Sequence, residues 1–200
     1  MEEAKIKKKR QFSGGEDPFA KALLSWYDEN RRILPWREEP GPYHTWLSEI
    51  MLQQTRVEAV KGYYARFLSA LPKISDLANA EEEKVLKLWE GLGYYSRARN
   101  LQKAAQKIMT EYAGEMPKTF QELKKLPGIG EYTAAAIAYI VYKEEIPALD
   151  GNLLRIFARL TSYPKVVLEP EGKKLAFSYF QGKMRGIAPG DFNQALMDLG

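Results

Sequence analysis

Hydrophobic residues recur every three or four positions along most of the chain, as expected for helices that bury one face. Val57 to Leu71 carries one such stripe up to Pro72, and Leu101 to Tyr112 carries another that ends at Gly114. The alternation typical of strands is scarce, and no fixed-period repeat stands out. The pattern predicts an all-α fold of about ten short helices joined by brief connections.

Local signals mark where several of these helices begin. Asp17-Pro18 places an N-cap residue before a proline at the first helical position, which predicts a helix running toward Arg32. Thr119 and Glu122 have the spacing of a capping box and predict a short helix that ends near Leu126. The remaining predicted helices are 45–55, 81–90, 132–143, 152–160, 171–184 and a last one from Phe192 onward.

The composition is that of a globular protein, and it narrows the possible chemistry. Hydrophobic residues make up 45% of the 200 positions, cysteine is absent and His44 is the single histidine. These residues therefore form no disulfide and supply no thiolate, and a zinc site is not expected. Carboxylates and hydroxyls remain as catalytic groups.

No segment reads as a membrane span or an export signal. The longest nearly apolar run, Ala134 to Tyr142, covers about half of the 20 residues that a membrane-spanning helix needs. Met1 to Arg10 is charged where a signal peptide would be apolar. We therefore expect no membrane partner and an intracellular protein of the cytoplasm or nucleoid.

The charge balance points only weakly toward nucleic acid. Thirty Lys and Arg against 26 Asp and Glu give a net charge of +4, and five of the cations lie in the first ten residues. Residues 1–16 are expected to form a basic, flexible tail that could contact a polyanion, although a simply solvated tail explains the same pattern.

The segment Leu126-Pro-Gly-Ile-Gly130 lies between two predicted helices. Gly128 and Gly130, with Ile129 between them, predict a tight hairpin whose backbone can approach a ligand closely. Amide groups at the start of the next helix favour an anion such as a DNA phosphate. An ordinary turn between helices is the alternative, and helix–LPGxG–helix favours phosphate binding over it.

Two carboxylates have surroundings that would push their pKa values apart. Glu49 is the only charged residue between Thr45 and Thr55, so loss of hydration would raise its pKa and suit it to act as a general acid. Asp150 precedes a predicted helix, whose amides would favour its ionised form. A surface glutamate and a simple helix cap are the alternatives, and for Asp150 taken alone the cap is the better one. A proton donor beside an anion suits cleavage of a glycosidic bond.

Two further segments combine aromatic, amide and cationic side chains. Gly91 to Arg99 holds Tyr94 and Tyr95 beside two arginines, and Gln53 to Arg56 leaves the predicted helix of Glu49. Aromatic side chains beside cations can stack on bases or wedge into a duplex. Alternatively, the tyrosines belong to the core and Arg97 and Arg99 form a solvated face.

Taken in order, these motifs resemble the MutY-type adenine DNA glycosylases, in the helix-hairpin-helix superfamily that also contains endonuclease III. The resemblance runs from about Phe19 to the last residue. It rests on the following segments: Pro35-Trp-Arg37, Trp46 to Thr55, Gly91 to Arg99, Leu126 to Thr133, Leu149-Asp-Gly-Asn152 and Phe192 to Gly200.

The resemblance implies two helical lobes with the active site in the cleft between them. A six-helix barrel with the hairpin would span 35–143, and a second lobe would combine 17–34 with 144–200. It also implies a reaction, removal of adenine mispaired with 8-oxoguanine or guanine, and a partner, double-stranded DNA that carries such a mispair. The base must leave the duplex before a protein acid can reach it. We expect the protein to act as a monomer.

The resemblance also assigns roles to individual residues. Glu49 would protonate N7 of adenine, and Asp150 would stabilise the oxocarbenium-like sugar, electrostatically or through a transient covalent adduct. Tyr132 and Asn152 would order the sugar and the water. Arg37 and Gln194 would contact the flipped adenine, while Gln54 and Tyr94 would wedge into the duplex near 8-oxoguanine.

Tyr132 favours a monofunctional glycosylase. Endonuclease III-like enzymes carry a lysine at the matching position, which attacks the sugar and forms an imine, and tyrosine cannot do this. A bifunctional lyase of that kind and a non-catalytic helix-hairpin-helix DNA-binding module are the two alternatives. Glu49 and Asp150, each within its full motif, argue against the second.

Relatives of this type usually continue past the final Asp-Leu-Gly into four cysteines that bind a [4Fe–4S] cluster. We expect no cofactor within residues 1–200, and the cluster only if the natural chain continues with those cysteines. The domain that checks for 8-oxoguanine is expected beyond the same point, so we do not expect these 200 residues alone to discriminate fully between mispairs.

Overall fold

The computed structural model describes residue 12 and residues 17–200, and within them all regular secondary structure is helical. This confirms the predicted all-α class. Apart from Phe12, the predicted basic tail at residues 1–16 lies outside the described residues. The described part separates into two compact units, one formed by its residues up to Arg32 together with Glu145–Gly200 and the other by Ile33–Glu144.

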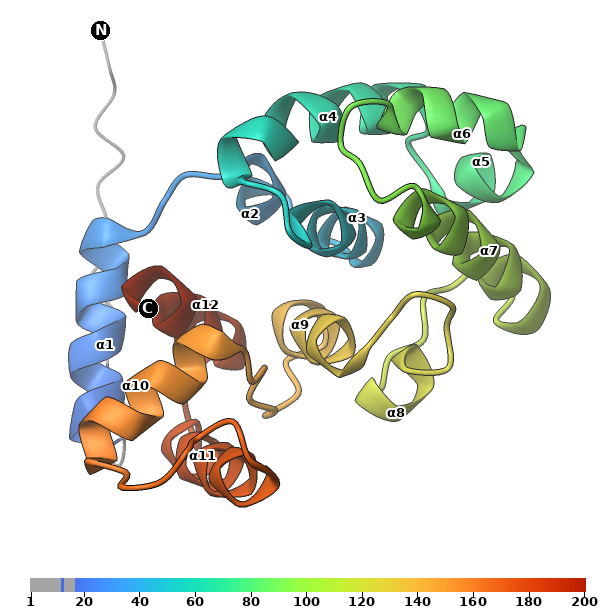
Figure 1. Ribbon diagram of the computed structural model, residues 1–200. Helices are drawn as coiled ribbons and strands as arrows, with labels where there is room; N and C mark the ends of the chain where they lie inside the picture. The colour runs from blue at the N-terminus through green and yellow to red at the C-terminus, as the bar shows by residue number, and fades with distance from the viewer. Residues whose placement is uncertain (1–11, 13–16) are drawn as a thin grey trace, which may run out of the picture. The chain divides into compact units, whose positions relative to one another are not determined.

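Unit 1 combines both ends of the chain, and its described residues form four helices, which are labelled in Figure 1. They are α1 (Pro18–Asn30), α10 (Gly151–Thr161), α11 (Pro170–Lys183) and α12 (Pro189–Leu199). Helix α12 packs on both α1 and α10, and α10 also packs on α11. The last part of the chain therefore builds one core with the first helix.

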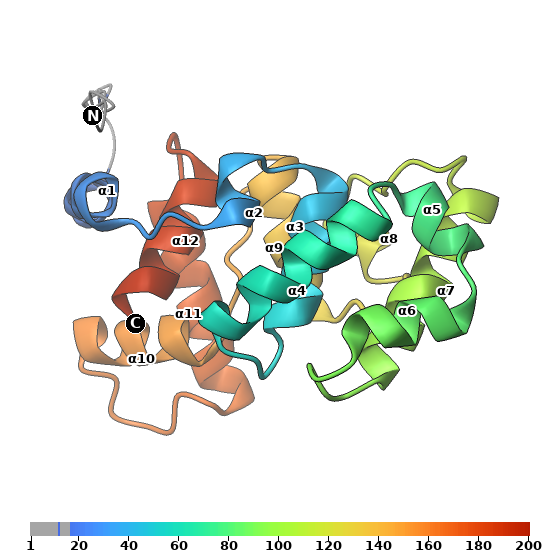
Figure 2. The same ribbon diagram turned by 90° about the horizontal axis from the view of Figure 1, so that it is seen from above.

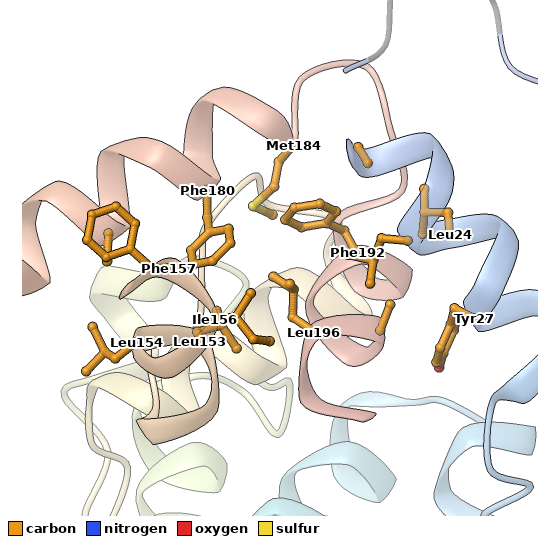
Figure 3. Close-up of a cluster of buried hydrophobic side chains, with 14 residues drawn as sticks. Leu24, Tyr27, Leu153, Leu154, Ile156, Phe157, Phe180, Met184, Phe192 and Leu196 are labelled. Carbon is orange, nitrogen blue, oxygen red and sulfur yellow. The ribbon is translucent and has the colours of Figure 1, made fainter. Parts of the chain in front are cut away.

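That core is made of large apolar side chains from all four helices (Figure 3). Leu24 and Tyr27 come from α1, Phe180 from α11, and Phe192 and Leu196 from α12, and each is at most 4% exposed. The rings of Phe180 and Phe192 meet edge to face at 6.4 Å. Burying a side chain of this size contributes about 1.5–3 kcal/mol, so the four helices stabilise one another.

Asp17 caps the start of α1, as the sequence predicted. Asp17 Oδ1 accepts hydrogen bonds from the amides of Phe19 at 2.9 Å and Ala20 at 3.2 Å, which confirms the predicted N-cap. Its other oxygen pairs with Lys183 Nζ of α11 at 2.8 Å. Burial raises the pKa of Asp17, but Lys183 and the two amides together outweigh burial, so the pKa lies below its ordinary value of 3.8.

Unit 2 holds the other eight helices of the described chain, seen from above in Figure 2. They are α2 (Pro35–Glu38), α3 (Pro42–Leu52), α4 (Val57–Ala70), α5 (Ile74–Asn79), α6 (Glu82–Trp89), α7 (Ser96–Glu111), α8 (Phe120–Leu123) and α9 (Glu131–Val141). Helix α3 packs against α9, α4 and α7. Helix α9 has buried alanines at 134, 135, 136 and 138, and these small side chains allow α3 to pack closely against it.

The helix boundaries differ from the sequence predictions in a few places. The short helices α2 and α5 were not predicted, because four to six residues give too little periodicity to detect. Thr119 Oγ1 caps α8 by accepting the amide of Glu122 at 3.3 Å, as predicted, but the helix ends at Leu123 and not near Leu126. Gly114 ends α7 as predicted: its amide bonds to Ile108 O at 3.0 Å with φ at 81°.

Candidate functional site

Glu49 lies near the end of α3, the central helix of unit 2. Pro42 begins the helix, and the neighbouring side chains of Trp46, Ser48 and Ile50 are buried while Glu49 itself is half-buried. The structure therefore places a carboxyl group on a helix that is otherwise packed into the core, as the sequence predicted. The role of Glu49 as a general acid stays a prediction.

Four non-glycine residues of unit 2 have φ in the left-handed region, and two of them, Gln54 and Tyr94, are candidate site residues. Gln54, after α3, has φ at 58°, and Tyr94, before α7, has φ at 48°. Such conformations cost about 1–3 kcal/mol each and persist only where neighbouring contacts impose them. Both side chains are nevertheless exposed, Tyr94 by 64%. Tyr95 is 40% exposed, so the alternative that these tyrosines belong to the core is wrong.

Arg97, in the first turn of α7, is the group that joins these two turns. Its Nη1 donates to the carbonyls of Ile50 at 2.9 Å, Met51 at 3.1 Å and Gln53 at 2.5 Å. Its Nη2 donates to Leu92 O at 3.1 Å, Gly93 O at 3.2 Å and Thr55 Oγ1 at 3.3 Å. The guanidinium thus caps the C-terminal end of α3 and holds both turns.

The alternative that Arg97 forms part of a solvated face is therefore wrong. Its guanidinium also lies 5.6 Å from the Tyr94 ring and 5.5 Å from the Trp89 ring. Desolvation lowers the pKa of Arg97, although arginine stays charged at any physiological pH. Arg99 differs, because it pairs with Glu82 at 3.0 Å on the exposed surface.

The predicted hairpin between α8 and α9 is anchored by apolar side chains. Leu126 and Ile129 are buried, and the amide of Ile129 donates to Leu126 O at 3.2 Å within the turn. Gly128 has φ at 75°, and a Cβ there would lie 2.7 Å from Cβ of Asn100. A Cβ on Gly130 would meet nothing within 4 Å. Gly128 is thus required by the turn, whereas Gly130 leaves open space beside the backbone.

Amide donors for a phosphate would come from Gly130 onward, because the amide of Ile129 serves the turn itself. The first amides of a helix have no partner within that helix, and Gly130 is the N-cap of α9. Asn100, which packs against Gly128, was missed by the sequence analysis. It lies on a different helix, and nothing in its local sequence signals the contact.

Tyr132 is the second residue of α9, directly after the hairpin, and its side chain is half-buried. The next residue, Thr133, accepts a hydrogen bond at 3.3 Å from the side chain of Gln53, just past the end of α3. The end of the Glu49 helix and the start of the Tyr132 helix are therefore tied together within unit 2.

Asp150 is the N-cap of α10 in unit 1. Its Oδ1 accepts the backbone amide of Leu153 at 2.9 Å, so the predicted capping role is confirmed. Its Oδ2 accepts a hydrogen bond at 3.1 Å from Nδ2 of Asn152. Arg155 Nη2 in turn donates to Asn152 Oδ1 at 2.7 Å and also contacts the carbonyl of Gly200. Arg155 thus fixes the amide that faces Asp150.

Asn193 of α12 holds the segment that leads to Asp150. Its side chain is fully buried, accepts the amide of Ala148 at 3.0 Å and donates to Ile146 O at 3.2 Å and Pro189 O at 3.0 Å. The sequence analysis included Asn193 in a motif but gave it no role, because the contact bridges residues far apart in the chain.

Gln194 and Arg37 lie in different units, Gln194 on α12 and Arg37 on α2. Both side chains are half-buried. Gln194 Nε2 donates to Gly190 O of its own helix at 3.2 Å, which leaves the carbonyl end of its amide for other partners. The roles assigned to these two residues stay predictions.

The residues of this chain do not fit an iron–sulfur cluster. The sequence holds no cysteine to supply the thiolates. Among residue 12 and residues 17–200, no group of three or more His, Asp or Glu side chains is arranged to hold a metal ion. Within the same residues, no helix is both long and apolar enough to cross a bilayer.

Comparison with solved structures identifies the fold. A thermostable thymine-DNA glycosylase matches with a TM-score of 0.82 at 27% identity, over 90% of this chain and 83% of its own. A trapped endonuclease III–DNA covalent intermediate matches with a TM-score of 0.69 at 20% identity, over 90% of this chain and 82% of its own.

Sequence comparison gives the same result. The adenine DNA glycosylase of Mus musculus is 44% identical over 194 residues, covering 91% of this chain and 37% of the mouse protein. That of Homo sapiens is 41% identical over 191 residues, covering 91% and 35%. That of Buchnera aphidicola subsp. Baizongia pistaciae is 39% identical over 183 residues, covering 91% and 52%. The chain thus spans between about a third and a half of the length of these relatives.

A match over most of the chain identifies the protein family. Residues 47–176, which run from α3 into α11, match the HhH-GPD superfamily base excision DNA repair protein family. They include Glu49, the hairpin and Asp150. The chain belongs to the HhH-GPD superfamily of base excision DNA repair proteins.

Proposed function

We propose that this chain is a monofunctional adenine DNA glycosylase that hydrolyses the N-glycosidic bond of adenine mispaired with 8-oxoguanine or guanine. The observation that carries the proposal is the similarity over 91% of the chain to proteins named adenine DNA glycosylase. The half-buried Glu49 and the hydrogen-bonded Asp150 supply the two carboxylates that such a reaction needs.

Glu49 acts as the general acid. It donates a proton to N7 of the flipped adenine, which draws electrons from the bond between C1′ and N9 and makes the base a better leaving group. As that bond breaks, positive charge develops on C1′ and on the ring oxygen of the sugar. Water then attacks C1′ and loses a proton, which restores the acid form of Glu49, and the products are free adenine and an abasic site.

Asp150 stabilises the positive sugar with its carboxylate. The Leu153 amide and the Asn152 side chain both donate to that carboxylate. They also hold the carboxylate in one orientation, which is the main requirement for electrostatic stabilisation of a transition state. Asn152 and Tyr132 order the sugar and the attacking water.

The other residues bring the adenine out of the duplex and hold it. Gln54 and Tyr94 enter the base stack from their exposed turns, and Arg37 and Gln194 contact the extruded base. Gly130 and the start of α9 bind the DNA backbone without reading sequence. A strained backbone under an exposed aromatic side chain supports the wedge role of Tyr94, since that strain does nothing for the core.

The test is single-turnover excision from duplexes that hold adenine opposite 8-oxoguanine, guanine or thymine. It is run with the full natural chain and with residues 1–200. With the full natural chain, we expect excision from the 8-oxoguanine and guanine mispairs and little from the thymine pair. Excision by the longer chain alone would assign the chemistry correctly but show that residues 1–200 are insufficient. DNA binding by both chains with no excision would identify a non-catalytic binding module instead.

A further inference from the structure

We propose that Arg97 is a positioning residue that holds Gln54 and Tyr94 in the conformation needed to enter the DNA duplex. The proposal rests on the proposed function, because that function has Gln54 and Tyr94 enter the base stack. We call these two residues the wedge. The proposal concerns how the duplex is opened and not the cleavage chemistry.

The first argument is the strain in the two turns. Gln54 and Tyr94 both have positive φ, and both side chains are exposed, so burial of their own side chains does not offset the strain. The compensation has to come from contacts to the neighbouring backbone. Arg97 supplies such contacts by donating to the carbonyls of Gln53, directly before Gln54, and Gly93, directly before Tyr94. It also donates to the side-chain hydroxyl of Thr55, directly after Gln54.

The second argument is the geometry of the donor. Nη1 donates to carbonyls at the end of α3 and in the turn of Gln54. Nη2 donates to carbonyls in the turn of Tyr94 and to Thr55. Only a planar guanidinium presents donors in such a fixed fork. A lysine would keep the charge near the C-terminal end of α3, where the helix dipole favours a cation, but its single nitrogen could not hold both turns.

The third argument is that Arg97 contacts the wedge itself. Its guanidinium lies 5.6 Å from the centre of the Tyr94 ring, and its backbone amide donates to Tyr94 O at 2.9 Å. The ring is thereby held against a fixed charge before any DNA arrives. A side chain that is already ordered loses less conformational entropy on binding than a mobile one.

The experiment measures unstacking separately from cleavage. A duplex carries 2-aminopurine, a fluorescent base, next to the adenine mispair, and its fluorescence rise at saturating protein reports opening of the stack. Arg97→Lys is expected to lower the equilibrium constant for opening by roughly 5- to 30-fold, the factor that 1–2 kcal/mol of lost preorganisation gives. Gln54→Ala combined with Tyr94→Ala is expected to cause a loss of at least similar size.

A double-mutant cycle separates positioning from a general effect on stability. When both wedge residues are already alanine, Arg97→Lys should change opening by less than about twofold, because the groups through which it acts are gone. An undiminished effect in that background would overturn the proposal. An unchanged opening constant in the folded Arg97→Lys protein would overturn it too.

Arg66→Lys is the matched control. Arg66 also donates to a carbonyl at the end of a helix, Leu88 O at 3.1 Å, but none of its recorded contacts is to either turn. It should leave opening unchanged, and an equal loss would mean that any such arginine matters. If Arg97→Lys does not fold, Thr55→Val replaces it in the same cycle, because it removes one acceptor of Nη2.

The two proposals fail in different ways. Wild-type protein that opens the duplex but releases no adenine would refute the proposed reaction and leave the role of Arg97 testable. The role of Arg97 alone would be refuted if the wild-type protein releases adenine but Arg97→Lys lowers the opening constant equally with and without the side chains of Gln54 and Tyr94.

Discussion

Asn152 donates a hydrogen bond to Oδ2 of Asp150 at 3.1 Å, while the other carboxylate oxygen accepts the amide of Leu153 at 2.9 Å. One oxygen therefore belongs to the helix cap and the other faces a side chain that Arg155 holds in place. This division allows the structural and the chemical roles of Asp150 to be separated by substitution.

Asp150→Asn is expected to abolish most excision without unfolding the protein. Asparagine is as good an N-cap as aspartate, so α10 keeps its first turn, but the neutral amide cannot stabilise a positive sugar. We expect single-turnover excision to fall on the order of 10²- to 10³-fold or more. Asp17→Asn, the same change at the cap of α1, should leave excision unchanged. Turnover that survives Asp150→Asn would refute the assignment.

The two hairpin glycines are expected to respond differently to alanine. Gly128→Ala forces a side chain into positive φ and against Asn100, so we expect the free energy of unfolding to drop by about 1–3 kcal/mol. Gly130→Ala should change stability by less than about 0.5 kcal/mol. It should instead weaken DNA binding several-fold, whatever the sequence, because the methyl group keeps a phosphate from the backbone. Urea unfolding and DNA titration distinguish the two effects, and unaltered affinity in Gly130→Ala would contradict phosphate binding here.

Tyr132 determines whether the protein can form an imine with DNA. With abasic DNA and borohydride, the wild-type protein should give no covalent adduct, because a phenol cannot condense with the sugar aldehyde. Tyr132→Lys introduces an amine that can, and reduction of the imine would trap it as a stable secondary amine visible on a denaturing gel. Tyr132→Phe is the control and should trap nothing. A strong wild-type adduct would mean that a lysine elsewhere in the chain acts as the nucleophile and that the protein is a lyase.

The pair between Asp17 and Lys183 should make the stability of the chain depend on pH in the acid range. The pKa of Asp17 is lowered in the folded state, so its contribution is complete above the ordinary value of 3.8 and is lost as pH falls through the folded-state pKa. Wild type should exceed Asp17→Asn in urea midpoint at pH 6, and the gap should close below pH 3.8. Lys183→Met removes the partner and should reduce the same gap. A gap that stays constant down to the lowest pH would show that the ion pair contributes nothing.

Much of the fold follows from local sequence signals. The periodic apolar stripes predict α4 and α7, and Asp17-Pro18 predicts the start of α1 because capping and the fixed φ of proline are local effects. The hairpin and the cap at Asp150 were predictable for the same reason.

The parts that could not be predicted depend on contacts between distant residues. Nothing in the sequence around Gln54 or Tyr94 indicates positive φ, since the conformation is imposed through Arg97. From the sequence, Arg97 could be interpreted as a cation that contacts DNA or solvent. Only the structure shows that it donates to backbone carbonyls. No local sequence signal predicts the role of Asn193, because the folding of unit 1 brings Ile146 and Ala148 to it.

The division of unit 1 between the two ends of the chain has a consequence during protein synthesis. Helix α1 leaves the ribosome before unit 2, but the α12 side chains that pack with Leu24 and Tyr27 follow only after unit 2. At ordinary translation speeds the delay is on the order of ten to thirty seconds, during which the apolar face of α1 is exposed. All of Ile33–Glu144 is synthesised within that interval, so unit 2 can fold before the apolar face of α1 is covered.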